Sequence, residues 1–192
     1  MTESTLSLSK FDAAERQLLL AIRLFFADED PVSIHTLAES AGQVFHDIGK
    51  DLGVVSLVRD YELIIPEKKR DWLAAIFKAR NFFKHADKDP NGILEFRPST
   101  NDFSLIDAVG MYGSLKRRFA PETIVFLMWF AVRYPELVAE ESDLGQIVKK
   151  FAAGGITPDA EKKENFRKMI AEIRSGEIPM PNVALYAGET KA

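Results

Sequence analysis

Apolar residues in this chain recur three and four positions apart in one segment after another, and that spacing places them on one face of an α-helix. In residues 10–27 this face comprises Leu18, Leu19, Ile22, Phe25 and Phe26. Proline or glycine separates most of the periodic segments, as expected at helix ends. The expected helices span residues 10–27, 34–52, 66–86, 102–119, 121–134, 143–153 and 157–175. Residues 54–65 are apolar and could form a short strand or an irregular connection, and we expect a connection.

Seven helices with short connections predict an all-α fold, in the form of an up-and-down helical bundle with additional C-terminal helices. The 192 residues suit one compact domain, so we expect a single helical domain over 1–192. Within it, residues 10–119 are expected to form the bundle core and 120–176 the additional helices. Residues 177–192 contain two prolines and are expected to form an extended tail. Ser33 is the expected N-cap of the second helix.

Composition excludes several classes of site. The chain has no cysteine, which rules out disulfides, thiolate zinc sites and cysteine nucleophiles. The first residues have no basic start followed by an apolar run, so no signal peptide is expected. The most apolar run, residues 123–132, is shorter than the roughly 20 residues that cross a bilayer. We therefore expect a cytoplasmic protein with no membrane partner.

The net charge of −4 provides no overall attraction for nucleic acid. Between Glu67 and Lys88, however, seven lysines and arginines stand against three acidic residues, and Lys116-Arg117-Arg118 forms a second basic cluster. Such clusters are commonly solvated helix faces, but a local basic patch is also what an acidic protein needs to hold phosphates.

The stretch ARNFFKHADKDPNG, residues 79–92, concentrates polar side chains at the end of the third expected helix. At about 100° per residue, Arg80 and Lys84 share one strip of the helix, and Asn81 and His85 share the next. Arg80 and His85 then point about 140° apart in an ideal helix. They can meet at one target only if the helix kinks, if its end opens, or if another subunit supplies a second copy.

These residue types suit RNA cleavage by transesterification, which requires no metal and no cofactor. A histidine such as His85 can transfer the proton of the 2′-hydroxyl or of the leaving oxygen. The guanidinium of Arg80 can stabilise the charged phosphate of the transition state, and Asn81 can orient the imidazole or a phosphate oxygen. The purely structural alternative is that Arg80 pairs with a carboxylate near the core while His85 caps the helix C-terminus.

The order Arg80-Asn81-Phe82-Phe83-Lys84-His85 resembles the signature of HEPN-domain proteins, in which an arginine and a polar residue precede a histidine. The resemblance covers this motif specifically and residues 10–119 by helix order only. It implies a small helical bundle that forms a homodimer, with two copies of the signature meeting at a cleft. Many such proteins are metal-independent endoribonucleases of toxin–antitoxin or defence systems, and others are inactive and bind nucleotides or partners.

What the resemblance implies for this chain is a catalytic set of Arg80, Asn81 and His85. RNA would be the substrate, and Lys78, Lys84 and Lys88 would attract its backbone. A neutralising partner protein would be a further consequence of a toxin-type role. The alternative is a non-catalytic helical protein that binds a partner protein or a nucleotide, which the acidic balance and the additional apolar helices favour.

Two parts of the sequence resemble metal sites. Asp87, Asp89, Asn91 and Gly92 match the opening of a calcium loop, but Pro98 stands where the loop needs a bidentate glutamate, so a turn is favoured. His35 and His46 lie at the margin of the second helix's apolar stripe, without a carboxylate pair at metal-ligand spacing. The sequence therefore predicts no metal site, and it contains no P-loop or dinucleotide-binding motif.

Overall fold

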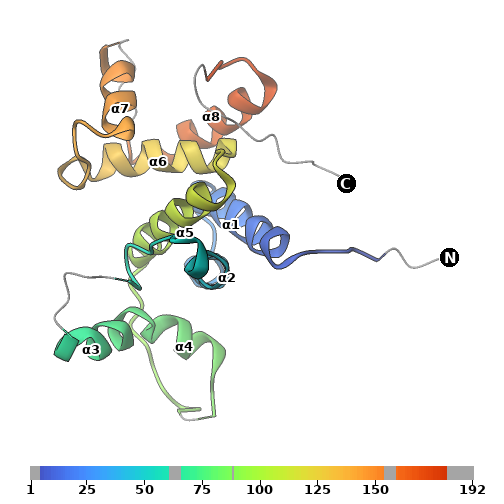
Figure 1. Cartoon of the computed structure of the whole chain (residues 1–192), viewed down its shortest axis with the longest axis vertical. Helices are drawn as coiled ribbons and strands as arrows, with labels where there is room; N and C mark the ends of the chain where they lie inside the picture. The colour runs from blue at the N-terminus through green and yellow to red at the C-terminus, as the bar shows by residue number, and fades with distance from the viewer. Residues whose placement is uncertain (1–4, 61–65, 88, 154–158, 181–192) are drawn as a thin grey trace.

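The computed structural model describes residues 5–60, 66–87, 89–153 and 159–180. These residues form eight α-helices and two short 3₁₀-helices, and contain no β-strand (Figure 1). The all-α prediction is confirmed, and the helix packing is consistent with a bundle. The α-helices are α1 (Lys10–Phe26), α2 (Pro31–Gly49), α3 (Pro66–Ile76), α4 (Lys78–Lys84), α5 (Thr100–Lys116), α6 (Pro121–Arg133), α7 (Asp143–Ala153) and α8 (Lys163–Ser175). The 3₁₀-helices are η1 (Lys50–Leu52) and η2 (Pro135–Leu137).

Side-chain caps define the starts of α1 and α2. Ser9 Oγ accepts a hydrogen bond from the Asp12 backbone N–H at 3.1 Å, and Asp12 accepts one from the Ser9 N–H at 2.9 Å, forming a capping box. The predicted cap Ser33 is wrong, because Asp30 caps α2 and accepts a hydrogen bond from the Ser33 N–H at 2.8 Å. Pro31 then occupies the first helical position, where a missing N–H leaves no intrahelical bond unmade.

One apolar core is shared by α1, α2, α5, α6 and α8. Phe26 of α1, Phe126 of α6 and Phe166 of α8 are almost completely buried in it, and the rings of Phe26 and Phe166 stack with centroids 5.6 Å apart. Helix α6 is buried on nearly all sides, which explains why residues 123–132 lack a polar face. Helices α6 and α8, which follow residue 120, therefore pack in the same core as α1, α2 and α5. Among the described helices, none combines the length and apolar character needed to cross a bilayer.

Helices α3 and α4 lie outside this core. We call residues 66–87 and 89–97 the arm; its helices lie on the far side of α2 from α6, α7 and α8 (Figure 1). Helix α3 has no buried residue, and α4 buries only Ala79. By its spacing in the third expected helix, Trp72 is predicted to face inward with the apolar residues, but the residue is 37% exposed, so this prediction is wrong. The physical reason is that α4, not α3, packs against α2.

The third expected helix, residues 66–86, is divided in two. Helix α3 ends at Ile76, and α4 begins at Lys78 after Phe77, which lies between them with φ −88° and ψ 5°. Helix α4 ends at Lys84, so His85 lies beyond it. The last expected helix begins only at Lys163, while Thr157 and Pro158 lie outside the described residues. It ends at Ser175 and is followed by the C-cap Gly176, whose φ of +82° favours glycine.

Candidate functional site at the end of α4

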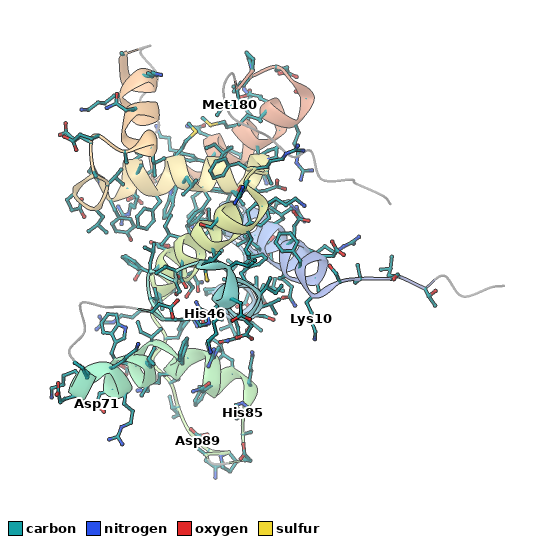
Figure 2. All side chains as sticks on the ribbon, in the orientation of Figure 1. Lys10, His46, Asp71, His85, Asp89 and Met180 are labelled. Atoms are coloured by element: carbon teal, nitrogen blue, oxygen red, sulfur yellow. The ribbon has the colours of Figure 1, made fainter. Side chains whose placement is uncertain are left out.

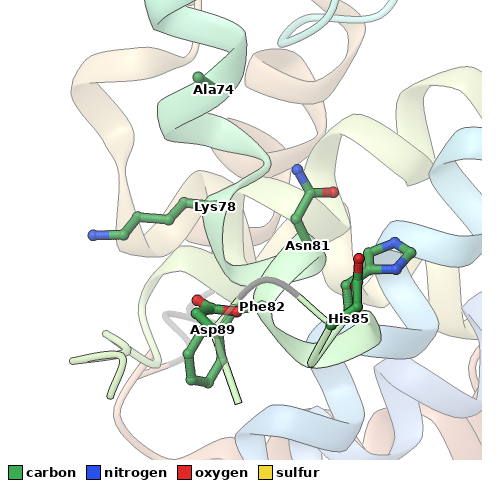
Figure 3. Close-up of a pocket in the computed structure, with 7 residues that line it drawn as sticks. Ala74, Lys78, Asn81, Phe82, His85 and Asp89 are labelled. Atoms are coloured by element: carbon green, nitrogen blue, oxygen red, sulfur yellow. The ribbon is translucent and has the colours of Figure 1, made fainter. Parts of the chain in front are cut away.

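An open pocket of about 710 Å³ lies along the outer side of α4 and the turn that follows it. Figure 3 shows its lining, which combines two carboxylates, an ammonium, an imidazole and an amide with apolar groups. The lining residues are Ala74, Lys78, Asn81, Phe82, His85, Asp87 and Asp89. Two of the three predicted catalytic residues, Asn81 and His85, therefore line one cavity.

The position of His85 follows from how α4 ends. His85 is the C-cap, with φ −132° and ψ 119°, and its backbone N–H donates to the Asn81 carbonyl oxygen at 3.1 Å. The chain leaves the helix in an extended conformation at this residue, so the 140° separation expected from a continuous helix does not apply. In Figure 3 the Asn81 amide and the His85 ring lie on the same side of the helix end. Both side chains are exposed.

The three predicted RNA-binding lysines are placed differently from one another. Lys78 lines the pocket, but its side chain extends away from His85 (Figure 3). Lys84 is exposed and does not line the pocket, and Lys88 lies outside the described residues. Because Asp87 and Asp89 also line the pocket, its charge is mixed and not uniformly basic.

Arg80 does not line this pocket. Its Nη1 donates to Gln43 Oε1 of α2 at 2.9 Å, and its Cζ lies 3.9 Å from the centroid of the Phe77 ring. Burial lowers the pKa of the Arg80 guanidinium, with the Glu39 charge opposing that shift and Arg59 adding to it. Arg80 therefore holds α4 against α2 through a stacked ring and a side-chain amide. Within one described chain, it is not brought to the cavity that Asn81 and His85 share.

Behind Arg80 lies a buried ionic cluster that sequence reasoning missed. Arg59 donates to Glu39 at 3.0 Å and to Asp107, which also accepts a hydrogen bond from Ser56 Oγ at 2.8 Å. All three charged side chains are almost completely buried. Burial raises the pKa of the Asp107 carboxyl, and the Arg59 charge opposes that shift.

The cluster is linked to α4 and depends on a glycine. Arg59 Cζ lies 5.3 Å from the same Phe77 ring that Arg80 stacks on. A side chain at Gly42 would place its Cβ 3.2 Å from Arg59 Nη2, so the missing side chain makes room for the guanidinium beside α2. The signal in the sequence was two acids, Glu39 and Asp107, standing among the apolar positions of their helices.

His35 is fully buried, which corrects its interpretation as a residue at the margin of the apolar stripe. Its Nδ1 lies 3.0 Å from Asn101 Oδ1, while Asn101 Nδ2 donates to the Pro31 carbonyl at 2.9 Å. The amide is thereby oriented with its oxygen towards the imidazole, so Nδ1 carries the proton and Nε2 is left as an acceptor. Nε2 is buried without a hydrogen-bond partner.

His35 lies on α2 and contacts two residues of the arm. The ring makes edge contacts with Phe83 of α4 and Phe96, with centroids 5.7 and 5.1 Å away. Burial lowers the pKa of His35; Glu39 and the bond to Asn101 oppose this shift, and Arg80 adds to it. His35 is therefore neutral and contacts both sides of the segment that carries His85.

Neither the Asp-rich turn nor the histidines of α2 belong to a group of three possible metal ligands among the described residues. His46 Nε2 lies 2.9 Å from Asp60 Oδ1, which makes it one half of a side-chain pair between α2 and the connection after it. In the Asp-rich segment, the Gly92 N–H donates to the Asp89 carbonyl at 2.8 Å, as a tight turn does.

Comparison of the chain with protein-family models, with curated proteins and with solved structures found no match. The site is accordingly described by its own geometry: an imidazole and an amide side by side in an open pocket, with a guanidinium held on the other side of the same short helix.

Proposed function

We propose that this protein is an HEPN-like, metal-independent endoribonuclease that acts as a homodimer at the α4 pocket. The observation that supports this proposal is the exposed pair of Asn81 and His85 at one end of a pocket large enough for a nucleotide. An imidazole can accept and donate a proton near neutral pH, and an adjacent amide can orient it or a phosphate oxygen. The resemblance of Arg80-Asn81 and His85 to the HEPN signature points in the same direction.

In this proposal each residue has one task. His85 transfers the proton of the 2′-hydroxyl or of the leaving oxygen, and Asn81 orients the imidazole. Arg80 stabilises the phosphate, which requires that Arg80 of either copy exchange its hydrogen bond to Gln43 for the phosphate at the dimer cleft, because within each chain the guanidinium is directed to Gln43. Lys78, which lines the pocket, attracts the RNA backbone together with Lys84 and Lys88.

The test is cleavage of RNA by purified protein in EDTA, comparing His85→Ala with His46→Ala. Replacing His85 should abolish cleavage, because it removes the group that transfers the proton. The melting temperature should be almost unchanged, because His85 is exposed. His46 is bonded to Asp60, so its replacement should lower the melting temperature but retain cleavage below it. Intact RNA with wild-type protein, or equal cleavage by both variants, contradicts the proposal. Sedimentation equilibrium tests the homodimer against the monomer mass of 21.6 kDa.

A second candidate is a non-catalytic protein that binds a partner protein, including the neutralising partner of the first proposal. Leu52, Val55 and Leu57 are 69%, 65% and 60% exposed on the connection after α2, and α3 has no buried residue. Solvent-exposed apolar side chains close together in the sequence are typical of protein-binding surfaces. This candidate gains support if RNA is neither cleaved nor bound, and if Leu57→Ser weakens binding of a candidate partner without changing the melting temperature.

A further inference from the structure

A second pocket, of about 290 Å³, lies among the core helices, and no residue of α3 or α4 lines it. It is formed where α1 and α6 end and where α5 and α8 begin. Its lining combines aromatic walls with charges of both signs: Phe25, Asp28, Asp102, Trp129, Arg133 and Lys163 all contribute to it. None of these residues takes part in the proposed nuclease site.

Asp102 is the buried acid of this pocket, with 7% of its surface exposed. Tyr134 donates its hydroxyl proton to Asp102 Oδ2 at 2.6 Å. No other side chain in the described ranges donates to this carboxylate, so Oδ1 keeps its capacity to accept hydrogen bonds. Burial raises the pKa of the Asp102 carboxyl, with Tyr134, Lys163 and Arg133 opposing that shift. The charge is therefore incompletely compensated, and a bound ammonium would stabilise it.

Arg133 and Lys163 are the cations of the pocket, and both hold exchangeable partners. Arg133 donates to Glu161 at 2.6 Å, and Lys163 donates to Asp28 at 2.8 Å. The side chains of Glu161 and Asp28 are 75% and 72% exposed, and an ion pair with so exposed a carboxylate contributes little to stability. A ligand carboxylate can replace either partner at little cost in free energy.

The start of α5 is not the anion-binding element here. The backbone N–H groups of Thr100, Asn101 and Asp102 already donate to the carbonyls of residues 97–99, at 2.9–3.2 Å. An anion in this pocket must therefore be bound by the two side-chain cations. Lys163 is placed for this by the Phe25 ring, whose centroid lies 3.9 Å from the ammonium nitrogen.

We propose that this pocket binds a small free α-amino acid, with its ammonium group on Asp102 and its carboxylate on Arg133 and Lys163. A zwitterion complements both signs of charge at once. A simple cation would be repelled by Arg133 and Lys163, and a simple anion would be repelled by Asp102. The small volume and the walls of Phe25 and Trp129 favour a short apolar side chain.

The test is isothermal titration calorimetry of the full chain with L-alanine, L-valine and glycine, each up to 50 mM. Propionate and ethylammonium are the matched half-ligands, because each retains one end of alanine and lacks the other. L-Alanine or L-valine should bind at least tenfold more tightly than either half-ligand. Absence of binding by all three amino acids, or equal binding of propionate and L-alanine, overturns the proposal.

Two variants and one control assign the two ends of the ligand. Asp102→Asn retains an oxygen for the Tyr134 hydroxyl and loses only the charge, so amino-acid affinity should fall at least tenfold with the melting temperature close to that of the wild type. Arg133→Gln should weaken binding in the same way. Glu161→Gln removes the competing partner of Arg133 and should retain or tighten binding. Unchanged affinity in Asp102→Asn excludes the proposed role of this carboxylate.

Discussion

His35 is buried where α2 contacts the arm, and from its burial we predict how the stability of the protein depends on pH. His35 is fully buried, donates through Nδ1 to Asn101, and leaves Nε2 without a donor. Protonation would add a charge to a ring that contacts Phe83 and Phe96, and a proton at Nε2, which is buried without a hydrogen-bond partner. The charged groups that act on this ring are Glu39 on its own helix and Arg80 on α4.

Acidification should lower the free energy of unfolding through His35, because its pKa differs between the folded and the unfolded chain. The pKa of His35 is lowered in the folded protein below its ordinary value of 6.5. Above pH 6.5 the ring is neutral in both states, so its contribution to stability is complete. Below pH 6.5 the unfolded chain takes up a proton that the folded protein does not, and stability falls by at most about 1.4 kcal/mol per pH unit until the folded pKa is reached. Between pH 7.5 and 5.5 the expected loss is on the order of 1 kcal/mol.

Other groups also titrate, so the measurement must be a difference between variants. The pKa values of Asp102 and Asp107 are raised in the fold, and acidification therefore acts on them in the opposite direction. Urea unfolding of the wild type and of His35→Asn should be compared at pH 7.5 and 5.5, because asparagine can retain a donor to Asn101 without titrating near pH 6. The wild type should lose about 1 kcal/mol more than the variant over this range.

The matched control is His85→Asn, which replaces an exposed histidine and should retain the pH dependence of the wild type. If His35→Asn and the wild type lose the same free energy of unfolding on acidification, the buried neutral imidazole is not the cause and the reasoning is refuted. Hydrogen exchange gives a local check: after correction for the intrinsic pH dependence of exchange, the protection factors of α4 amides should fall more on acidification than those of α6.

Three further predictions concern stability. Arg59→Met should lower the free energy of unfolding by about 3–5 kcal/mol in urea, because it leaves Glu39 and Asp107 buried without their cation, while the same change at the exposed Arg16 should have little effect. Gly49→Ala should lower the free energy of unfolding by about 1–3 kcal/mol, because the new Cβ would lie 2.6 Å from the Cβ of Val54. Gly110→Ala should raise it by about 0.5–1 kcal/mol, because there is open space around Gly110. Equal effects of the two substitutions would contradict this argument. Millimolar calcium should not shift the melting temperature, because Pro98 replaces the bidentate ligand of a calcium loop, and a shift of several degrees would contradict that expectation.

The sequence predicted much of the helical framework, because helix periodicity and helix ends are local properties. Ser9, Pro121 and Gly176 mark boundaries that the structure places within a residue or two of the expected ones. The polar end of the third expected helix, which the sequence singles out, carries Asn81 and His85, and both side chains are exposed. The sequence did not predict the break at Phe77 or the end at Lys84, since the apolar pattern continues through both positions.

The tertiary structure decided which polar groups meet. Glu39, Arg59 and Asp107 are separated by 20 and 48 residues along the chain and form one buried cluster, and Asp102 and Tyr134 come together across two helices. It also decided that Arg80 packs on Phe77 and Gln43 while His85 leaves the helix towards the pocket. Periodicity specifies which face of a helix is apolar, but the partner of a buried charge depends on how several helices pack, and the spacing along the chain does not contain that information.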